Sequence, residues 1–172
     1  MENDNTRLIP LTQGKFAKVD AEDYHRLMEF KWFFAGGYAR RRIVTGTDSY
    51  GSFPMHRDIL NIMPGMEVDH IDGDTLNNTR ANLRACTRTQ NSYNQRKRKD
   101  NKSGYKGVSW MKSMQKWRAY IWIGGTYPKG RQYHLGFFDT PEEAAEAYNV
   151  EAIKAFGQFA KLNNIKQKEE AG

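Results

Sequence analysis

The sequence VDHIDGDTLNNTRANLRACTRTQN, residues 68–91, contains the pattern on which our prediction of the fold depends. Asp69 and His70 end a short apolar strand. Asn82 lies twelve residues after His70, and Asn91 lies nine residues further on, in a predicted helix. Two strands followed by a helix can bring Asp69, His70 and Asn91 together. An oxygen pair suits a hard cation and a nearby imidazole can take a proton from water, so the pattern favours a one-metal nuclease site.

Each of these residues also has an ordinary explanation. An isolated Asp-His pair is more often a surface or capping pair, Asn82 alone suits a turn, and Asn91 alone suits a helix surface. Only their combination favours the nuclease site.

The same stretch resembles the HNH endonucleases of phages and mobile introns. The resemblance covers roughly residues 8–94 and is most specific between Glu67 and Asn94. The matching segments are Met55-His56-Arg57, Val68–Asp74, Asn77-Asn78, Arg80–Arg84, Cys86-Thr87 and Gln90-Asn91. That family folds its site as a ββα-metal motif, so the resemblance implies the same motif here.

The resemblance also implies a role for each site residue. His70 would be the general base, and Asp69 would bind the divalent metal. Asn91 stands where many members have a histidine, and its amide oxygen would be the second metal ligand. Asn82 would tie down the loop and help to orient His70. A site with two oxygen ligands favours Mg²⁺ or Mn²⁺ over Zn²⁺.

Other residues near this stretch are open to two interpretations. Arg80, Arg84 and Arg88 fit contacts with DNA phosphates and plain solvent exposure equally well. His56 fits a supporting position beside the site, although a structural histidine is favoured. Cys86 fits a small buried residue with no redox role.

Charge and composition narrow the possible partners and compartments. The net charge is +7; residues 1–92 hold 12 basic and 12 acidic side chains, whereas residues 93–172 hold 15 and 8. A localised basic excess favours a polyanionic partner, although a solubilising surface explains it as well.

The one cysteine excludes a disulfide framework and cysteine-ligated zinc within one chain. The sequence has no apolar run of membrane-spanning length, and we expect a cytoplasmic protein, of a phage or prophage, acting in the host cell.

Turn and helix signals predict the remaining N-terminal elements. A hairpin is expected around Thr12–Lys15, and a helix from Asp20 as N-cap to Glu29, with Tyr24, Leu27 and Met28 on one face. The other expected elements are strands at 31–34, 38–44, 50–53, 66–71 and 83–85, and helices at 55–62 and 87–96.

A basic segment without apolar residues, 95–103, is interpreted as a linker between two domains, although a continuing solvated helix end is an alternative. We therefore expect an α+β protein with a nuclease domain at 1–94, a second domain at 104–163 and a disordered tail at 164–172.

The second domain is predicted to be a three-stranded sheet backed by one helix. Its strands are expected at 105–111, 116–123 and 132–138. In the middle strand Trp117, Ala119 and Ile121 alternate with Arg118, Tyr120 and Trp122. Thr140-Pro141-Glu142-Glu143 forms a capping-box signal, and the helix is expected to end at Gly157 and to pack on the Trp117 face.

This second domain resembles the APETALA2-type DNA-binding domain of plant ethylene-response factors. The segments that match include Tyr105–Val108, Lys116–Ala119, Leu135–Thr140, Glu142–Tyr148 and Ala160–Asn163. The resemblance implies a sheet in the DNA major groove, and the DNA-facing candidates are Lys106, Ser109, Met111, Lys116, Arg118, Tyr120, Trp122, Gln132 and His134. Several base-reading arginines of the plant domains are replaced here, by Ser109, Met111, Trp122 and Gln132, which puts the plant target preference in doubt. A partner-binding or dimer surface is the alternative for this face.

Together these patterns predict a homing-type endonuclease acting on double-stranded DNA, with Mg²⁺ or Mn²⁺ and no obligate protein partner. Its N-terminal domain would cut or nick DNA, and its C-terminal domain would add affinity. A non-catalytic DNA-binding regulator and an RNA-binding protein are the alternatives.

Overall fold

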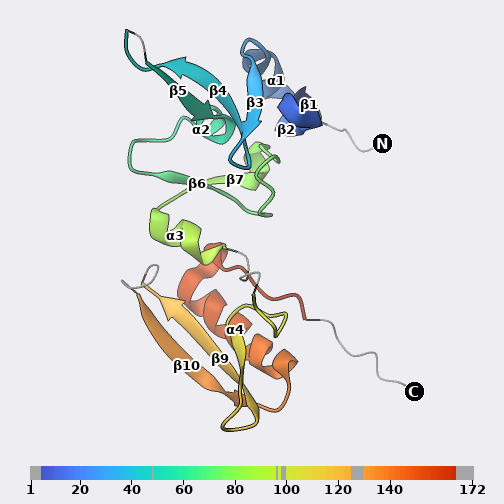
Figure 1. The fold of residues 1–172 in the computed structure, drawn as a ribbon, viewed down its shortest axis with the longest axis vertical. Coiled ribbons are helices and arrows are strands. Elements are labelled where there is room, and N and C mark those ends of the chain that lie inside the picture. The colour runs from blue at the N-terminus through green and yellow to red at the C-terminus, as the bar shows by residue number, and fades with distance from the viewer. Residues whose placement is uncertain (1–4, 48, 96, 98–99, 125–129, 166–172) are drawn as a thin grey trace, which may run out of the picture. The chain divides into compact units, whose positions relative to one another are not determined.

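The computed structural model describes residues 5–47, 49–95, 97, 100–124 and 130–165 (Figure 1). The chain divides into two compact units, Met1–Thr87 and Arg88–Gly172. Each unit combines helices with antiparallel sheet. The mixed α and β content agrees with the sequence-based prediction.

The N-terminal unit begins with a hairpin and a helix. β1 (Thr6–Pro10) pairs with β2 (Phe16–Asp20) across a turn that contains η1 (Thr12–Gly14), as the turn signal predicted. α1 (Ala21–Met28) follows β2 directly.

A three-stranded sheet and a short helix come next. β3 (Trp32–Ala35), β4 (Tyr38–Val44) and β5 (Tyr50–Pro54) form an antiparallel sheet with β4 in the middle. α2 (Met55–Leu60) follows and ends at Asn61, whose backbone is left-handed. The helix therefore ends two residues before the bound at residue 62 that the sequence predicted.

The stretch with the candidate site forms a second hairpin. β6 (Glu67–His70) pairs antiparallel with β7 (Leu83–Cys86), and η2 (Arg80–Asn82) leads into β7. Cys86 is fully buried, as expected, and burial raises the pKa of its thiol to about 11. One apolar core joins both hairpins, β3 and the two helices of this unit through Ile9, Val19, Leu27, Trp32, Met55, Ile59, Val68 and Leu83.

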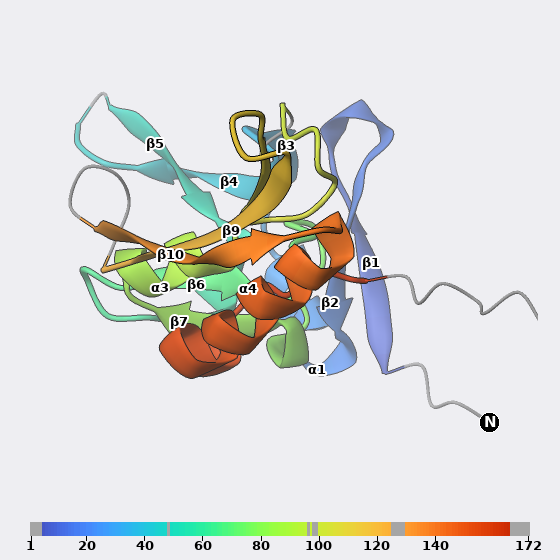
Figure 2. The ribbon, with the colours of Figure 1, turned by 90° about the horizontal axis from the view of Figure 1, so that it is seen from below.

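The second unit contains a three-stranded antiparallel sheet and a long helix that lies along one face of it (Figure 2). The strands are β8 (Val108–Met111), β9 (Lys116–Ile123) and β10 (Arg131–Phe138), with β9 in the middle. α4 (Pro141–Phe156) starts with the predicted capping box and is followed by η3 (Gly157–Phe159).

Small residues let α4 lie close to the sheet. Ala144 and Ala145 are fully buried against Val108 and Ala119, while Tyr148, Ala152 and Phe156 pack on Ile121. Burial of alternate residues in β9 confirms the predicted alternation and leaves Arg118, Tyr120 and Trp122 on the opposite face.

α3 (Arg88–Tyr93), expected as part of the nuclease domain, belongs to the second compact unit. The ring of Tyr93 stacks on Phe156 with centroids 3.9 Å apart, and its hydroxyl accepts a hydrogen bond from the Gly124 amide at 3.3 Å. The ammonium of Lys106 donates to the carbonyls of Tyr93 and Gln95 at 2.6 and 2.8 Å. The division between compact units therefore falls before α3, whereas the sequence suggested one at residues 95–103.

Of two expectations in α1, one was confirmed and one was wrong. Asp20 occupies the N-cap position, as predicted, although its side chain makes no capping bond. Its carboxylate instead accepts a hydrogen bond from the Arg80 amide at 2.7 Å. Met28 is 43% exposed whereas Leu27 is buried, because consecutive helical residues are turned by about 100° around the axis.

Two parts of the sequence-based prediction lie outside the described residues. They are part of the expected linker, at 96 and 98–99, and the end of the expected tail, at 166–172. In the described part of the chain, no helix has the length and apolar character needed to cross a membrane.

Candidate functional site

The register of the β6–β7 hairpin places the Asp69-His70 pair at the end of a strand. His70 lies opposite Leu83, and Asp69 lies opposite Arg84. Asp69 and His70 are each only 5% exposed, although polar side chains normally face water. Their burial makes this pair the candidate centre of the unit.

The imidazole of His70 lies among polar and aromatic side chains from three separate segments. Its Nε2 is 3.4 Å from the amide oxygen of Asn78. The His56 ring meets the His70 ring edge-on at 5.1 Å, and the Tyr38 ring lies 6.2 Å away. Tyr38 also meets His56 at 5.3 Å, so the three rings form one cluster.

Burial lowers the pKa of His70, and the hydrogen bond with Asn78 and the nearby Asp72 and Asp69 carboxylates only partly offset this effect. The ring is therefore neutral at neutral pH, which is the form that can accept a proton. If Nε2–H donates to Asn78, Nδ1 is the basic nitrogen.

Asn82 ties down the loop that follows His70. Its amide oxygen accepts a hydrogen bond from the Asp72 amide at 3.0 Å. Its amide nitrogen donates to the Asp72 carboxylate at 2.9 Å and to the Asn77 carbonyl at 2.8 Å. Asn82 thus holds the loop, whereas Asn78 is the amide next to the His70 ring.

The N-terminal hairpin braces the same loop from the other side. The Lys18 amide donates to the Leu76 carbonyl at 2.8 Å, and the Asn78 amide donates to the Lys18 carbonyl at 2.7 Å. β2 therefore fixes the backbone of Asn78 and, through it, the surroundings of His70.

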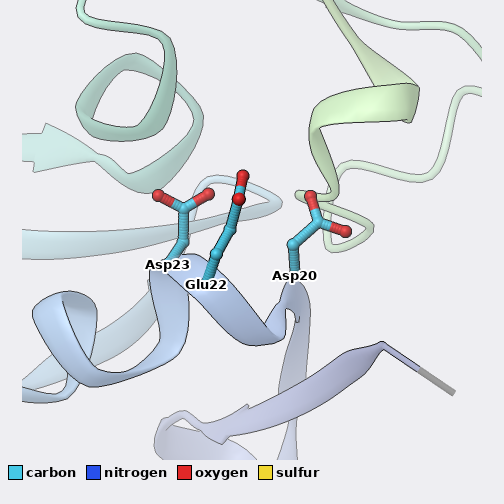
Figure 3. Close-up of side chains that lie close together, drawn as sticks. All are labelled: Asp20, Glu22 and Asp23. Carbon is cyan, nitrogen blue, oxygen red and sulfur yellow. The ribbon is translucent and has the colours of Figure 1, made fainter.

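Three acidic side chains, Asp20, Glu22 and Asp23, lie close together at the start of α1 (Figure 3). All three interact with Arg80. The Arg80 guanidinium donates to both oxygens of Asp23 at 2.8 Å and pairs with Glu22 at 2.9 Å. Hydrogen bonds from Arg80 and Arg26 lower the pKa of Asp23 against the opposing effect of burial. Arg80 was expected to contact DNA, but its ion pairs instead connect η2 to α1.

Asp69 has a cation beside it. The guanidinium of Arg84 donates to Asp69 Oδ2 through Nε at 2.8 Å and through Nη2 at 2.5 Å. This ion pair follows from the cross-strand register and orients the carboxylate. A carboxylate oxygen is a ligand that suits a hard divalent cation, so the donor chemistry of Asp69 fits such an ion. Arg84, expected as a DNA contact, supports Asp69.

Asn91 lies in α3 of the second unit and is half-buried. Its α3 position agrees with the predicted helix.

The open face of the second sheet carries most of the expected DNA-facing side chains. Register places Arg118 beside Ser109 and Phe137, Tyr120 beside His134, and Trp122 beside Gln132. The Arg118 guanidinium lies 4.9 Å from the centre of the Tyr120 ring. Aromatic and cationic groups therefore alternate on this face.

Two lysines that were expected to contact DNA interact with other groups of the second unit. Lys106 bonds the carbonyls at the end of α3, and burial lowers its pKa to about 8. Lys116 pairs with Asp139 at 2.8 Å, although both remain exposed. A groove of about 840 Å³ nearby is lined by Ser109, Tyr120 and Trp122 among others.

Sequence reasoning missed part of the histidine site. Tyr38 was assigned only to a strand, Asn78 only to the family pattern, and His56 was favoured as a structural residue. The burial expected of the Met55–Ile59 helix was the one signal that could have pointed to His56. No spacing in the sequence connects Tyr38 with His70.

Comparisons with known proteins agree with both halves of this description. A family model for HNH endonucleases matches residues 61–93, and one for the AP2 domain matches residues 103–158. HNH nucleases generally use a divalent metal ion. No solved structure matches the chain.

The chain is also similar to two viral proteins, in one case over most of its length. An uncharacterized HNH endonuclease of Acanthamoeba polyphaga mimivirus is 31% identical over 165 residues, which cover 92% of this chain and 80% of that protein. Protein 3.8 of Escherichia phage T7 is 37% identical over 59% of this chain and 78% of its own length. APETALA2-like protein 2 of Oryza sativa is 39% identical over 36% of this chain and 13% of its own length. The chain therefore belongs to the HNH endonuclease family and carries an AP2 domain, a DNA-binding module, after its nuclease domain.

Proposed function

We propose that this protein is a metal-dependent, homing-type endonuclease that hydrolyses phosphodiester bonds of double-stranded DNA in a phage-infected or lysogenic host cell. The observation that carries the proposal is the buried, neutral His70 beside Asp69, within the segment that matches the HNH family. A neutral imidazole held by burial is suited to general-base catalysis.

In the proposed reaction, His70 takes a proton from a water molecule, whose oxygen then attacks the scissile phosphorus. The bond from phosphorus to the 3′ oxygen breaks, and the 3′ oxygen leaves and takes up a proton from solvent. Asn78 holds the His70 ring, and Asn82 holds the loop behind it.

Asp69 and Asn91 are the proposed metal ligands in a ββα-metal arrangement, with Mg²⁺ or Mn²⁺ as the ion because both ligand atoms are oxygens. For Asn91 the support is the family resemblance alone. When bound, the ion offsets negative charge on the phosphorane and the leaving oxygen. Arg84 orients the Asp69 carboxylate for this role.

The AP2 domain is proposed to supply affinity for duplex DNA. Its support is the aromatic and basic sheet face formed by Arg118, Tyr120, Trp122 and His134. Linking the two domains raises the effective concentration of the nuclease at its substrate.

Incubation of the purified protein with supercoiled plasmid tests this proposal. We expect open-circle or linear products with Mg²⁺ or Mn²⁺, none with EDTA, and a loss of at least about 100-fold in rate for Asp69→Asn. Cutting that persists in EDTA would contradict the metal requirement. Binding without cutting under every metal condition would instead support a non-catalytic DNA-binding regulator.

A further inference from the structure

Six arginines of the N-terminal unit fall into two groups that differ in their partners. Arg26, Arg41, Arg80 and Arg84 each pair with a carboxylate within 4.0 Å. Arg40 donates to the Ser52 hydroxyl at 2.9 Å and to the Ser52 carbonyl at 3.2 Å. Arg57 donates to the Met66 carbonyl at 3.1 Å. Among the residues that the structure describes, Arg40 and Arg57 have no carboxylate partner.

These hydrogen bonds hold the two guanidinium groups in place without neutralising them. Both side chains are half-buried, so water screens their charges less than it would on a fully exposed arginine. The result is two fixed positive charges in a part of the chain, residues 1–92, whose basic and acidic side chains balance at 12 each.

Both charges lie close to the histidine cluster. Arg57 follows His56 in α2, and Arg40 lies two residues after Tyr38 in β4, on the same face of the sheet. The Tyr38 ring contacts both His56 and His70. The charges of Arg57 and Arg40 also act on His56, where they add to the effect of burial and of His70 in lowering its pKa to about 3.

Two positive charges therefore lie near the neutral histidine pair, and no acidic side chain among the described residues pairs with either of them. An anion bound there would neutralise these charges. Arginine presents a planar fork of donors that matches phosphate oxygens.

We propose that Arg40 and Arg57 bind backbone phosphates of the DNA strand that is cut, and so place the scissile bond at His70. This inference rests on the proposed nuclease function. It assigns a substrate-binding role to residues that precede the segment 61–93 matched by the HNH family model. DNA would therefore contact the nuclease unit through β4 and α2 as well as the AP2 domain.

The test measures binding of the full chain to duplex DNA in EDTA over a range of salt concentrations, so that no cleavage interferes. Each phosphate contact contributes close to one unit to the slope of log K against log salt. We expect Arg40→Gln and Arg57→Gln each to reduce that slope by about one. Lys15→Gln, which removes an exposed charge from the turn before β2, should leave the slope unchanged.

The same variants are then assayed for plasmid cleavage in Mg²⁺. Loss of a charge-assisted hydrogen bond should lower kcat/KM by about tenfold or more. Arg40→Lys and Arg57→Lys, which retain the charge, should retain the salt slope. If the Gln variants fail to fold, Arg40→Met and Arg57→Met, which keep an apolar stem, replace them in the same measurements.

An unchanged slope in folded Arg40 and Arg57 variants would overturn the proposal, whether or not kcat/KM falls, because a structural role alone predicts that result. Since binding is measured without metal, the slope remains informative even if the wild-type protein proves unable to cut DNA. Failure of this inference and failure of the nuclease proposal are therefore distinguishable.

Discussion

Burial governs the chemistry of the two clustered histidines in the N-terminal unit. His56 is 9% exposed and His70 is 5% exposed, and burial is the largest cause of the lowered pKa of each. Both rings are therefore neutral in the folded protein at neutral pH. A neutral His70 is what the proposed reaction requires, and a neutral His56 can pack against it without repulsion between two cations.

The same burial makes stability depend on pH. The pKa of His56 is about 3 in the folded protein and near 6.5 in the unfolded chain, so between these values the unfolded chain binds more protons. The free energy of unfolding should therefore be greatest above pH 6.5 and fall as pH drops toward 3. Between pH 4 and 6, His56→Gln should reduce the steepness of this fall by about 1 kcal/mol per pH unit, measured by urea unfolding.

His25 provides the matched control for this measurement. It is exposed in α1, so His25→Gln should leave the pH dependence as it is in the wild type. A His56→Gln protein with the wild-type pH dependence would show that His56 is not buried in its neutral form.

At the level of secondary-structure elements, the segment just before β8 packs closely against the rest of the second unit, and this close packing depends on a glycine. Gly107 has a φ of +73°, and a Cβ added there would meet the Tyr148 ring and lie 2.5 Å from the Tyr120 carbonyl oxygen. The Gly107 carbonyl also accepts a hydrogen bond from the Tyr120 amide at 2.8 Å. The backbone at Gly107 is thus fixed on one side by β9 and on the other by α4.

Gly107→Ala should destabilise the second unit by about 3 kcal/mol or more, because neither a backbone oxygen nor a buried ring can move easily. Gly104→Ala is the control: Gly104 has a similar φ of +83° but open space around it, so only about 1 kcal/mol of backbone strain is expected. Chemical unfolding followed by tryptophan fluorescence measures both. Equal losses for the two variants would contradict the close packing at Gly107.

Local signals explain why most elements could be predicted from the sequence. Turn signals identified β4 and alternation identified β9, each at its observed bounds, and the Thr140 and Glu143 capping box identified the start of α4. The surroundings of His70 could not be predicted in this way. Tyr38, His56 and Asn78 reach it through strand pairing and core packing between distant segments, which leave no fixed spacing in the sequence.

The same distinction explains why Arg80 and Arg84 were open to two interpretations. Their positive charge suggested DNA, but pairing with Asp23 and Asp69 depends on which segments meet in the fold. The extent of the second compact unit was likewise set by a long-range contact, the stacking of Tyr93 on Phe156.

At the scale of the whole molecule, the two units differ in charge. The basic excess of the chain lies in residues 93–172, whereas the buried histidine site belongs to a part with no net charge. Long-range attraction to DNA is therefore expected to come mainly from the AP2 side, and the N-terminal unit contributes a few fixed contacts and the chemistry.

We expect His70 to act on DNA as a general base and not to be needed for holding DNA on the protein. The direct test compares wild type and His70→Ala for cutting of supercoiled plasmid in Mg²⁺ or Mn²⁺ and for duplex binding in EDTA. We predict that cutting falls by about 100-fold or more while the dissociation constant changes less than about threefold. Cutting by His70→Ala at the wild-type rate would contradict this account.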